Sequence, residues 1–145
     1  MRAVLLKHRG PDGAVVTEVP RPALKEGHVV IRMLAASVNR VDLYMRDNGA
    51  GITHTLPQIM GVDGVGEVAE ANPDSNFKPG DRVILYPYEF CGACRYCLAG
   101  DQTLCLSARI FGEHRDGTMA EYLLAPEVSV LRLSDKVDID GAATL

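Results

Sequence analysis

The chain has 145 residues, 47% of them hydrophobic and 23% charged, which suits one compact domain and excludes both a disordered chain and two domains of ordinary size. Fifteen Lys and Arg against nineteen Asp and Glu give a formal net charge of −4 with no block of either sign, so we expect no nucleic-acid partner. No apolar stretch is long enough to cross a membrane, and Lys7, His8 and Arg9 end the apolar run at the N-terminus too early for a signal peptide.

Short runs rich in β-branched residues, separated by Gly and Pro, recur through most of the chain and predict a mainly β fold, an irregular barrel or sandwich. Segments 20–28 and 72–80 contain the prolines and glycines of connections rather than of central strands. Glycines are so closely spaced in 61–71 that its backbone must bend or approach another segment closely. The expected strands cover residues 1–6, 14–19, 29–37, 61–71, 82–86, 117–126 and 127–134.

The segment 37–49 changes to a helical period, with Val38, Val41 and Met45 at helical spacing. Asn39 or Ser37 can cap its start, and Gly49 follows its end. This is the clearest helix of the chain, and residues 138–145 predict the first turns of a second one.

All four cysteines fall within residues 91–105, spaced CxxCxxC with seven residues before the last. The segment around them has no hydrophobic period, so it needs another source of order. Zinc binds four thiolates tetrahedrally and contributes folding energy directly. We therefore predict a lobe at about 88–108 that is ordered by one structural zinc ion, bound by Cys91, Cys94, Cys97 and Cys105.

Disulfides, an iron–sulfur cluster or buried free cysteines are the alternatives. We expect a cytoplasmic protein, and thiols stay reduced in that compartment. A bacterial ferredoxin-type run would have its fourth cysteine three residues on and followed by proline, where this chain has Asp101. Free buried cysteines would lie in strands rather than in such a loop. Zinc is therefore the favoured interpretation.

Several segments, in this order and spacing, resemble the zinc-type medium-chain dehydrogenase and quinone oxidoreductase superfamily: VNRVDLYMRDNG, LPQIMGVDGVGEVAEA, FKPGDRV, the cysteine lobe and GTMAEYLLAP. The resemblance covers essentially all 145 residues. It implies that residues 1–145 form a GroES-like β-barrel, the substrate-side catalytic domain, with one or two short helices and a structural-zinc lobe.

The family's NAD(P)(H) cofactor lies mainly on a second, doubly wound domain with a glycine-rich turn. In this chain GVDGVGEV does not fit GxGxxG, and it begins a strand instead of following one. We expect this Rossmann domain to be absent from the chain, which by itself should neither bind the dinucleotide tightly nor turn over. The full-length protein is expected to be a homo-oligomer.

In the alcohol dehydrogenase branch a second, catalytic zinc is held by a cysteine at the position of Asn39 and a histidine at that of Val62, with a further ligand beyond this chain. Valine has no lone pair to donate, and an amide oxygen is a poor substitute for a thiolate. Tyr44 stands where that branch often has a histidine for proton relay. These differences argue against a catalytic zinc.

The quinone oxidoreductase branch has a segment like NRVDLYMR that supplies an asparagine and a tyrosine to the nicotinamide and substrate cleft. That resemblance makes Asn39 and Tyr44 candidate catalytic and cofactor-binding residues, with Asp63 as a further catalytic candidate and Arg40 as a contact for cofactor phosphate. Structural roles stay open for each of them: an N-cap, a half-buried aromatic, a ligand of backbone amides and a solvated helix residue.

We predict an NAD(P)H-dependent reductase of quinones, enones or related small carbonyl compounds. The alternatives are a zinc-dependent alcohol dehydrogenase and a zinc-stabilised binding or assembly module without catalysis. His54 lies in a loop where it could line a cleft or simply face solvent. Arg95 and Tyr96, between zinc ligands, could meet a partner surface or solvent.

Overall fold

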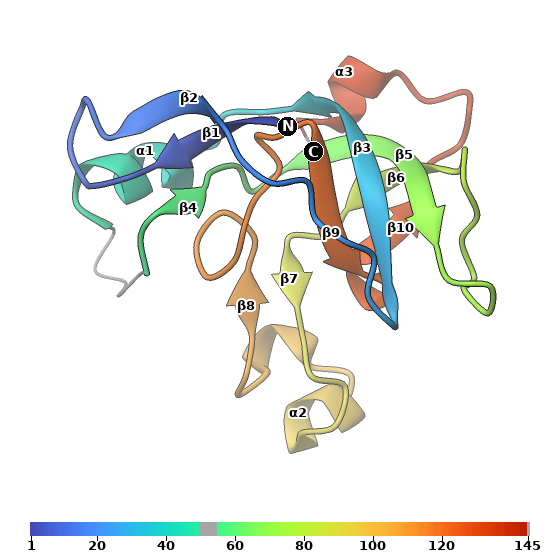
Figure 1. The fold of residues 1–145 in the computed structure, drawn as a ribbon. Coiled ribbons are helices and arrows are strands. Elements are labelled where there is room, and N and C mark those ends of the chain that lie inside the picture. Colours follow the sequence, from blue (N-terminus) through green and yellow to red (C-terminus); the bar gives the residue numbers. More distant parts are fainter. Residues whose placement is uncertain (50–54, 145) are drawn as a thin grey trace.

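The computed structural model describes residues 1–49 and 55–144 and consists mainly of short strands, as the sequence predicts (Figure 1). Its largest sheet is curled into half of a barrel and has the strand order β10-β6-β5-β3-β9. Neighbouring strands in this sheet are antiparallel. The strands are β3 (His28–Ala36), β5 (Gly64–Ala71), β6 (Arg82–Leu85), β9 (Tyr122–Pro126) and β10 (Val130–Arg132).

The centre of this sheet is the long pair of β3 and β5, whose register shifts between Val30 and Ile31 and again between Met33 and Ala35. Such irregularities bend a strand and increase its twist, which helps the sheet to curl. The sheet encloses an apolar core because every second residue of its strands points inward. The buried members of this core are Val29, Ile31, Val68, Val83, Leu85, Phe111, Leu123, Ala125 and Val130.

A second sheet has the order β2-β1-β4 and consists of β1 (Arg2–Leu6), β2 (Ala14–Glu18) and β4 (Gln58–Ile59). Helix α1 (Arg40–Asp47) lies beside it (Figure 1). The N-cap of α1 is Asn39, which agrees with the sequence prediction. The second predicted helix is α3 (Ile139–Ala142), capped by Asp138.

The lobe projects from the body at the end of a two-stranded ribbon formed by β7 (Tyr88–Glu89) and β8 (Arg109–Ile110) (Figure 1). Two short helical turns lie within it, α2 (Arg95–Leu98) and the 3-10 helix η2 (Gln102–Leu104). No helix in the described part of the chain is long and apolar enough to cross a bilayer.

The structure corrects three of the expected strands. The segment 117–126 is a strand only from Tyr122 onward. The segment 61–71 becomes a strand only at Gly64, because Gly61 has a φ of +101° and turns the chain between β4 and β5. The segment 127–134 begins as the 3-10 helix η3 (Glu127–Ser129) before β10. The strands β9 and β10 then lie at opposite edges of the five-stranded sheet.

Candidate zinc lobe and substrate site

The four cysteines converge on one point, with all their sulfur atoms within 4.8 Å of one another. The Sγ atoms of Cys91 and Cys97 are 3.9 Å apart, and the pairs Cys94–Cys97 and Cys91–Cys105 are each 3.6 Å apart. A sulfur tetrahedron around zinc at about 2.3 Å has edges of about 3.8 Å. The geometry therefore fits one tetrahedral zinc ion, and among the described residues it is the only such convergence of Cys, His, Asp and Glu ligand atoms.

Backbone N–H groups point at the sulfurs and favour the thiolates that zinc requires. The amide of Cys91 donates to Cys105 Sγ at 3.3 Å, and that of Cys94 donates to Cys91 Sγ at 3.4 Å. Hydrogen bonds from the amides of Cys97 and Leu106 lower the pKa of Cys94 to about 6. Loss of solvation raises the pKa of Cys97 to about 12, so this thiol needs a cation to displace its proton at neutral pH.

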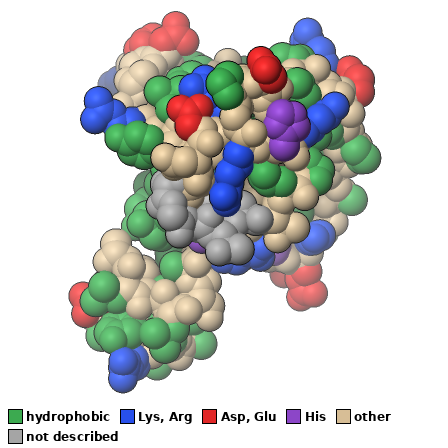
Figure 2. All heavy atoms as spheres, turned by 90° about the vertical axis from the view of Figure 1, so that its left-hand side faces the viewer, with side chains coloured by type: hydrophobic (Ala, Val, Ile, Leu, Met, Phe, Trp, Pro, Cys, Tyr) green, Lys and Arg blue, Asp and Glu red, His purple; other side chains and the backbone are tan. Residues whose placement is uncertain are grey.

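Arg115 joins the ribbon of the lobe to the barrel. Its guanidinium forms an ion pair with Glu89 on β7, and also donates to the Leu124 carbonyl on β9 at 2.9 Å. The same group stacks on the Phe111 ring, with 4.5 Å from Cζ to the ring centroid. The rest of the lobe stands apart from the body (Figure 2).

A second group of polar residues lies where α1 begins. The Asn39 amide nitrogen donates to Asp63 Oδ2 at 2.9 Å, although the two residues are 24 positions apart. The Asn39 Oδ1 atom accepts the N–H of Val41 at 3.3 Å, as an N-cap does. The structure thus brings together two of the predicted site residues, and Asn39 serves as a cap and as a partner of Asp63 at once.

Asp42 fixes this arrangement and was not among the predicted site residues. Its side chain is buried, with Oδ2 accepting the N–H of Asn39 at 2.8 Å and Oδ1 accepting the N–H of Gly61 at 3.1 Å. Burial raises the pKa of this carboxyl against the lowering effect of the two hydrogen bonds. The sequence signal was available, because Asp42 stands at the third helical position, where a capping box has its acidic residue.

Close backbone contacts hold the segment that carries Asp63. A Cβ added to Gly61 would lie 2.4 Å from Thr118 Oγ1, and one added to Gly117 would lie 2.1 Å from the Gly61 carbonyl oxygen. A Cβ on Gly112 would lie 2.6 Å from that same oxygen. The predicted close approach of the glycine-rich segment is therefore present, and its partners come from 111–118.

The other predicted residues do not join the pair of Asn39 and Asp63. Tyr44 is on the exposed side of α1, with 46% of its surface accessible, and no hydrogen bond within the described residues links its hydroxyl to that pair. Arg40, the first residue of the helix, is also exposed. His54 lies outside the described residues.

Glu113 is a buried carboxylate near this region. Its Oε2 atom has no hydrogen-bond partner in the described structure and lies 3.8 Å from His114 Nδ1. That nitrogen accepts the N–H of Ile110 at 3.2 Å, so it carries no proton to give to the carboxylate. Burial raises the pKa of Glu113; the nearby His114 opposes this effect, and the charge of Asp42 adds to it.

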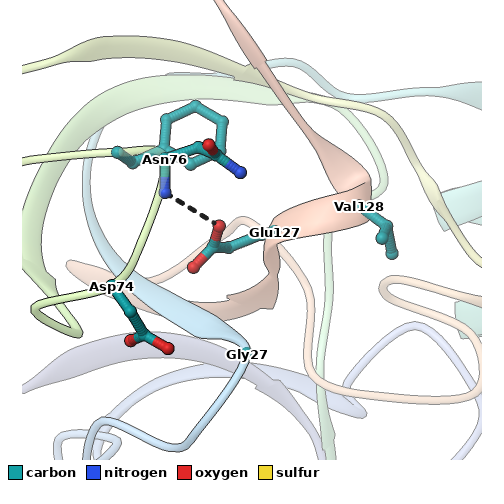
Figure 3. A pocket seen from close by; sticks show the side chains of 6 residues that line it. Gly27, Asp74, Asn76, Glu127 and Val128 are labelled. Carbon is teal, nitrogen blue, oxygen red and sulfur yellow. Dashed lines mark hydrogen bonds between the residues drawn. The ribbon is translucent and has the colours of Figure 1, made fainter.

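A hollow of about 490 Å³ lies elsewhere on the barrel (Figure 3). The Asn76 N–H donates to Glu127 Oε2 there at 3.4 Å. Asp74 and Glu127 give this hollow an acidic lining, and no residue of α1 or of 60–64 contributes to it. It is therefore separate from the site at Asn39.

The family model of the alcohol dehydrogenase GroES-like domain matches residues 25–135. An alcohol dehydrogenase of Geobacillus stearothermophilus is 41% identical over 125 residues, covering 85% of this chain and 37% of that protein. The L-threonine 3-dehydrogenase of Streptomyces coelicolor is 36% identical over 142 residues, covering 96% of this chain and 42% of that protein.

Solved structures agree with the sequence relatives. A crystal structure of an NAD-dependent alcohol dehydrogenase matches this chain with a TM-score of 0.94 and 37% identity. The match covers 100% of this chain and 43% of the chain in that crystal structure. A cobalt- and zinc-bound thermostable alcohol dehydrogenase of Pyrobaculum aerophilum covers 100% of this chain and 44% of its own, with a TM-score of 0.91 and 32% identity. The chain thus spans less than half the length of the relatives that it matches.

Proposed function

Because the chain belongs to the zinc-type medium-chain dehydrogenase superfamily, as its N-terminal GroES-like domain, we propose that it is the substrate-side domain of an NAD(P)H-dependent oxidoreductase with a structural zinc and no catalytic zinc. The substrates are small quinones, enones or related carbonyl compounds. The proposal concerns the full-length protein, since the cofactor of such enzymes is bound mainly by a second domain.

The hydrogen bond between Asn39 and Asp63 carries the proposal. Where the alcohol dehydrogenase branch has its cysteine and histidine ligands, this chain has an amide whose donor is already engaged by a carboxylate, and a valine that is only 7% exposed. Zinc prefers sulfur and imidazole nitrogen over an amide oxygen. The pair is thus better suited to hydrogen bonding than to holding a metal ion.

The Asn39 amide group has two N–H donors, of which Asp63 takes one. The second N–H can donate to the carbonyl oxygen of a substrate, where negative charge develops during reduction. Asp63 and the N-cap bond fix the orientation of the amide beforehand, so little reorganisation is needed when that charge appears. When bound, a nicotinamide would supply the hydride, while this domain would orient the carbonyl and stabilise the oxyanion until solvent protonates it.

Metal content and an Asn39 variant of the full-length protein test this proposal. We expect about one zinc per chain, and turnover that persists when no second zinc is present. Asn39→Ser keeps a cap acceptor but loses the amide donor, so it should lower kcat/KM for an enone or quinone by about 100-fold with little change in stability. Val38→Ala, at the exposed neighbouring position, is the control.

A zinc-dependent alcohol dehydrogenase is the second candidate, and the names of the relatives favour it. Both an alcohol dehydrogenase and a zinc-bound alcohol dehydrogenase structure are among them. In that case the full-length protein would hold a second tightly bound zinc, its removal would abolish alcohol oxidation, and Asn39→Ser would act through metal affinity. That result would refute the first proposal.

A further inference from the structure

The turn that follows β8 places a buried carboxylate beside a histidine. The Glu113 side chain is only 5% accessible, and its Oε2 atom has no hydrogen-bond partner among the described residues. His114 Nδ1 lies 3.8 Å from a carboxylate oxygen of Glu113, and 34% of the His114 side chain is accessible to solvent. A buried carboxylate without a donor is unfavourable, because burial penalises its charge. One additional proton and an approach of about 1 Å would join the two atoms by a hydrogen bond.

In the structure the His114 Nδ1 atom serves a different group. It accepts the backbone N–H of Ile110 at 3.2 Å, which requires a neutral imidazole with its proton on Nε2. The Ile110 carbonyl in turn accepts the N–H groups of Glu113 and His114, at 3.3 and 2.8 Å. The His114 ring thus closes the turn from 110 to 114. Because Nδ1 has a single lone pair, it cannot accept from Ile110 and share a proton with Glu113 at the same time.

The charges around the turn favour the uptake of a proton. Burial raises the pKa of Glu113, His114 opposes this effect, and the Asp42 carboxylate on α1 adds to it. Arg109 approaches from β8, and its guanidinium donates to the His114 carbonyl at 3.0 Å. The guanidinium of Arg115 is engaged in its ion pair with β7. Histidine is the side chain whose charge ordinarily changes between about pH 5 and 8, so a proton can enter this turn near neutral pH.

We propose that the turn 110–114 is a pH switch, in which one proton joins His114 Nδ1 to Glu113 Oε2 and releases the N–H of Ile110. The proton comes from solvent at the accessible imidazole, and no covalent bond other than an N–H or O–H bond changes. Either atom can hold the proton, because N–H⁺···O⁻ and N···H–O place the same hydrogen bond between them. When the proton leaves, the arrangement seen in the structure returns.

The switch lies against the segment that holds the site at Asn39. Gly112, in the middle of the turn, has a φ of +75°, and a Cβ added to it would lie 2.6 Å from the Gly61 carbonyl oxygen. The Gly61 N–H donates to Asp42 Oδ1, while Asp42 Oδ2 accepts the N–H of Asn39. Direct contacts therefore connect the turn to the site. The inference does not depend on the proposed reaction, because it concerns hydrogen bonds of the folded chain alone.

Hydrogen exchange of the full-length, zinc-loaded protein tests the proposal, read at single amides from about pH 8 to about pH 5. After correction for the intrinsic exchange rate, protection of the Ile110 amide should fall about fivefold on acidification, as expected for the loss of one hydrogen bond. The Phe111 amide donates to the Pro87 carbonyl at 3.1 Å and should stay protected, which makes it the internal control. Unchanged protection of Ile110 across this range would overturn the proposal.

Two variants separate the switch from a general loss of stability in acid. His114→Asn keeps an acceptor oxygen near the position of Nδ1 but does not titrate, so Ile110 should stay protected down to about pH 5. Glu113→Gln removes the carboxylate, and the pH at which Ile110 is released should fall by about one unit, because an opposite charge within about 4–6 Å favours a charged imidazole. Circular dichroism and zinc content verify that both variants are folded.

Two results with these variants would refute the proposal. One is release of Ile110 on acidification in His114→Asn to the same extent as in the wild type. The other is an unchanged release pH in Glu113→Gln, which would remove Glu113 from the switch.

Discussion

The barrel and the zinc lobe become ordered by different means. The barrel has a core of nine buried hydrophobic residues from five strands and the segment after β8, so its order comes from apolar burial. Within 88–108, Cys105 is the only buried side chain, and it is a metal ligand. Two regions of one chain can therefore lose their order separately, and Arg115 is one side-chain link between them.

The largest expected effect separates the two regions. Cys97→Ser should reduce the zinc content from about one ion per chain to near zero and leave 88–108 without a source of order. Hydrogen exchange should then become fast at lobe amides such as Leu98, which donates to the Cys94 carbonyl at 3.0 Å. Amides of β3 should stay protected. Ser107→Ala is the control, and a lobe that stays protected without zinc would contradict this account.

The second prediction perturbs the barrel and spares the lobe. Ile31 is 1% exposed in the middle of β3, so Ile31→Ala should lower the free energy of unfolding by about 2–5 kcal/mol in urea titrations. The zinc affinity of the folded protein should not change. Leu131→Ala, at a position 55% exposed, should cost less than about 0.5 kcal/mol. A parallel loss of zinc affinity would mean that the two regions are not independent.

The third prediction concerns the link between the regions. Arg115→Met removes the ion pair with Glu89 and the bond to the Leu124 carbonyl, and we expect a loss of about 2–3 kcal/mol in stability. Combined with Glu89→Gln in a double-mutant cycle, it should reveal a coupling energy of about 1 kcal/mol or more. Additive effects would show that the pair does not join lobe and body energetically.

The smallest expected effect is a gain in stability. Glu113 has a buried carboxylate oxygen with no hydrogen-bond partner among the described residues, and burial raises the pKa of Glu113, so ionisation destabilises the folded chain. The folded state binds this proton more tightly than the unfolded state does. The wild type therefore regains the lost stability as the pH falls through the raised pKa of Glu113.

Glu113→Gln should accordingly be about 1 kcal/mol more stable than the wild type at pH 8, and the difference should shrink toward pH 5. Urea titrations at both pH values measure it. The exposed Glu18, with a side chain 74% accessible, provides the control variant Glu18→Gln. If the stability difference between Glu113→Gln and the wild type grew as the pH fell, the pKa of Glu113 would be lowered and not raised by folding.

Local signals made much of the fold predictable. Runs of β-branched residues between Gly and Pro indicated the strands, the helical period with its cap indicated α1, and the cysteine spacing indicated the lobe. The conformation of segment 127–129 was harder to predict, because its residues suit a strand. Whether they form one depends on pairing with a neighbouring strand, which the local sequence does not specify. The η3 turn there separates β9 from β10, which pair with β3 and β6 at opposite edges of the sheet.

The candidate site was only partly predictable, because its contacts connect distant segments. Asn39 and Asp63 were both candidates, yet nothing local indicates that they bond across 24 positions. Asp42 looked like an ordinary residue in the first turn of a helix, and its burial depends on the Gly61 segment packing against that turn. The burial of Glu113, whose Oε2 has no hydrogen-bond partner within the described part of the chain, likewise depends on the packing of the whole region.

The crowding of Gly61, Gly112 and Gly117 has a consequence for engineering this domain. Any side chain at these positions would collide with backbone or with Thr118, so a mutant library that varies all residues near the substrate site would lose most of its members to misfolding there. Diversity is better placed at Val38 and Tyr44, whose side chains face solvent and can change size freely. Substrate specificity could then be changed through α1, while the close contact of the Gly61 segment with residues 112–118 stays constant.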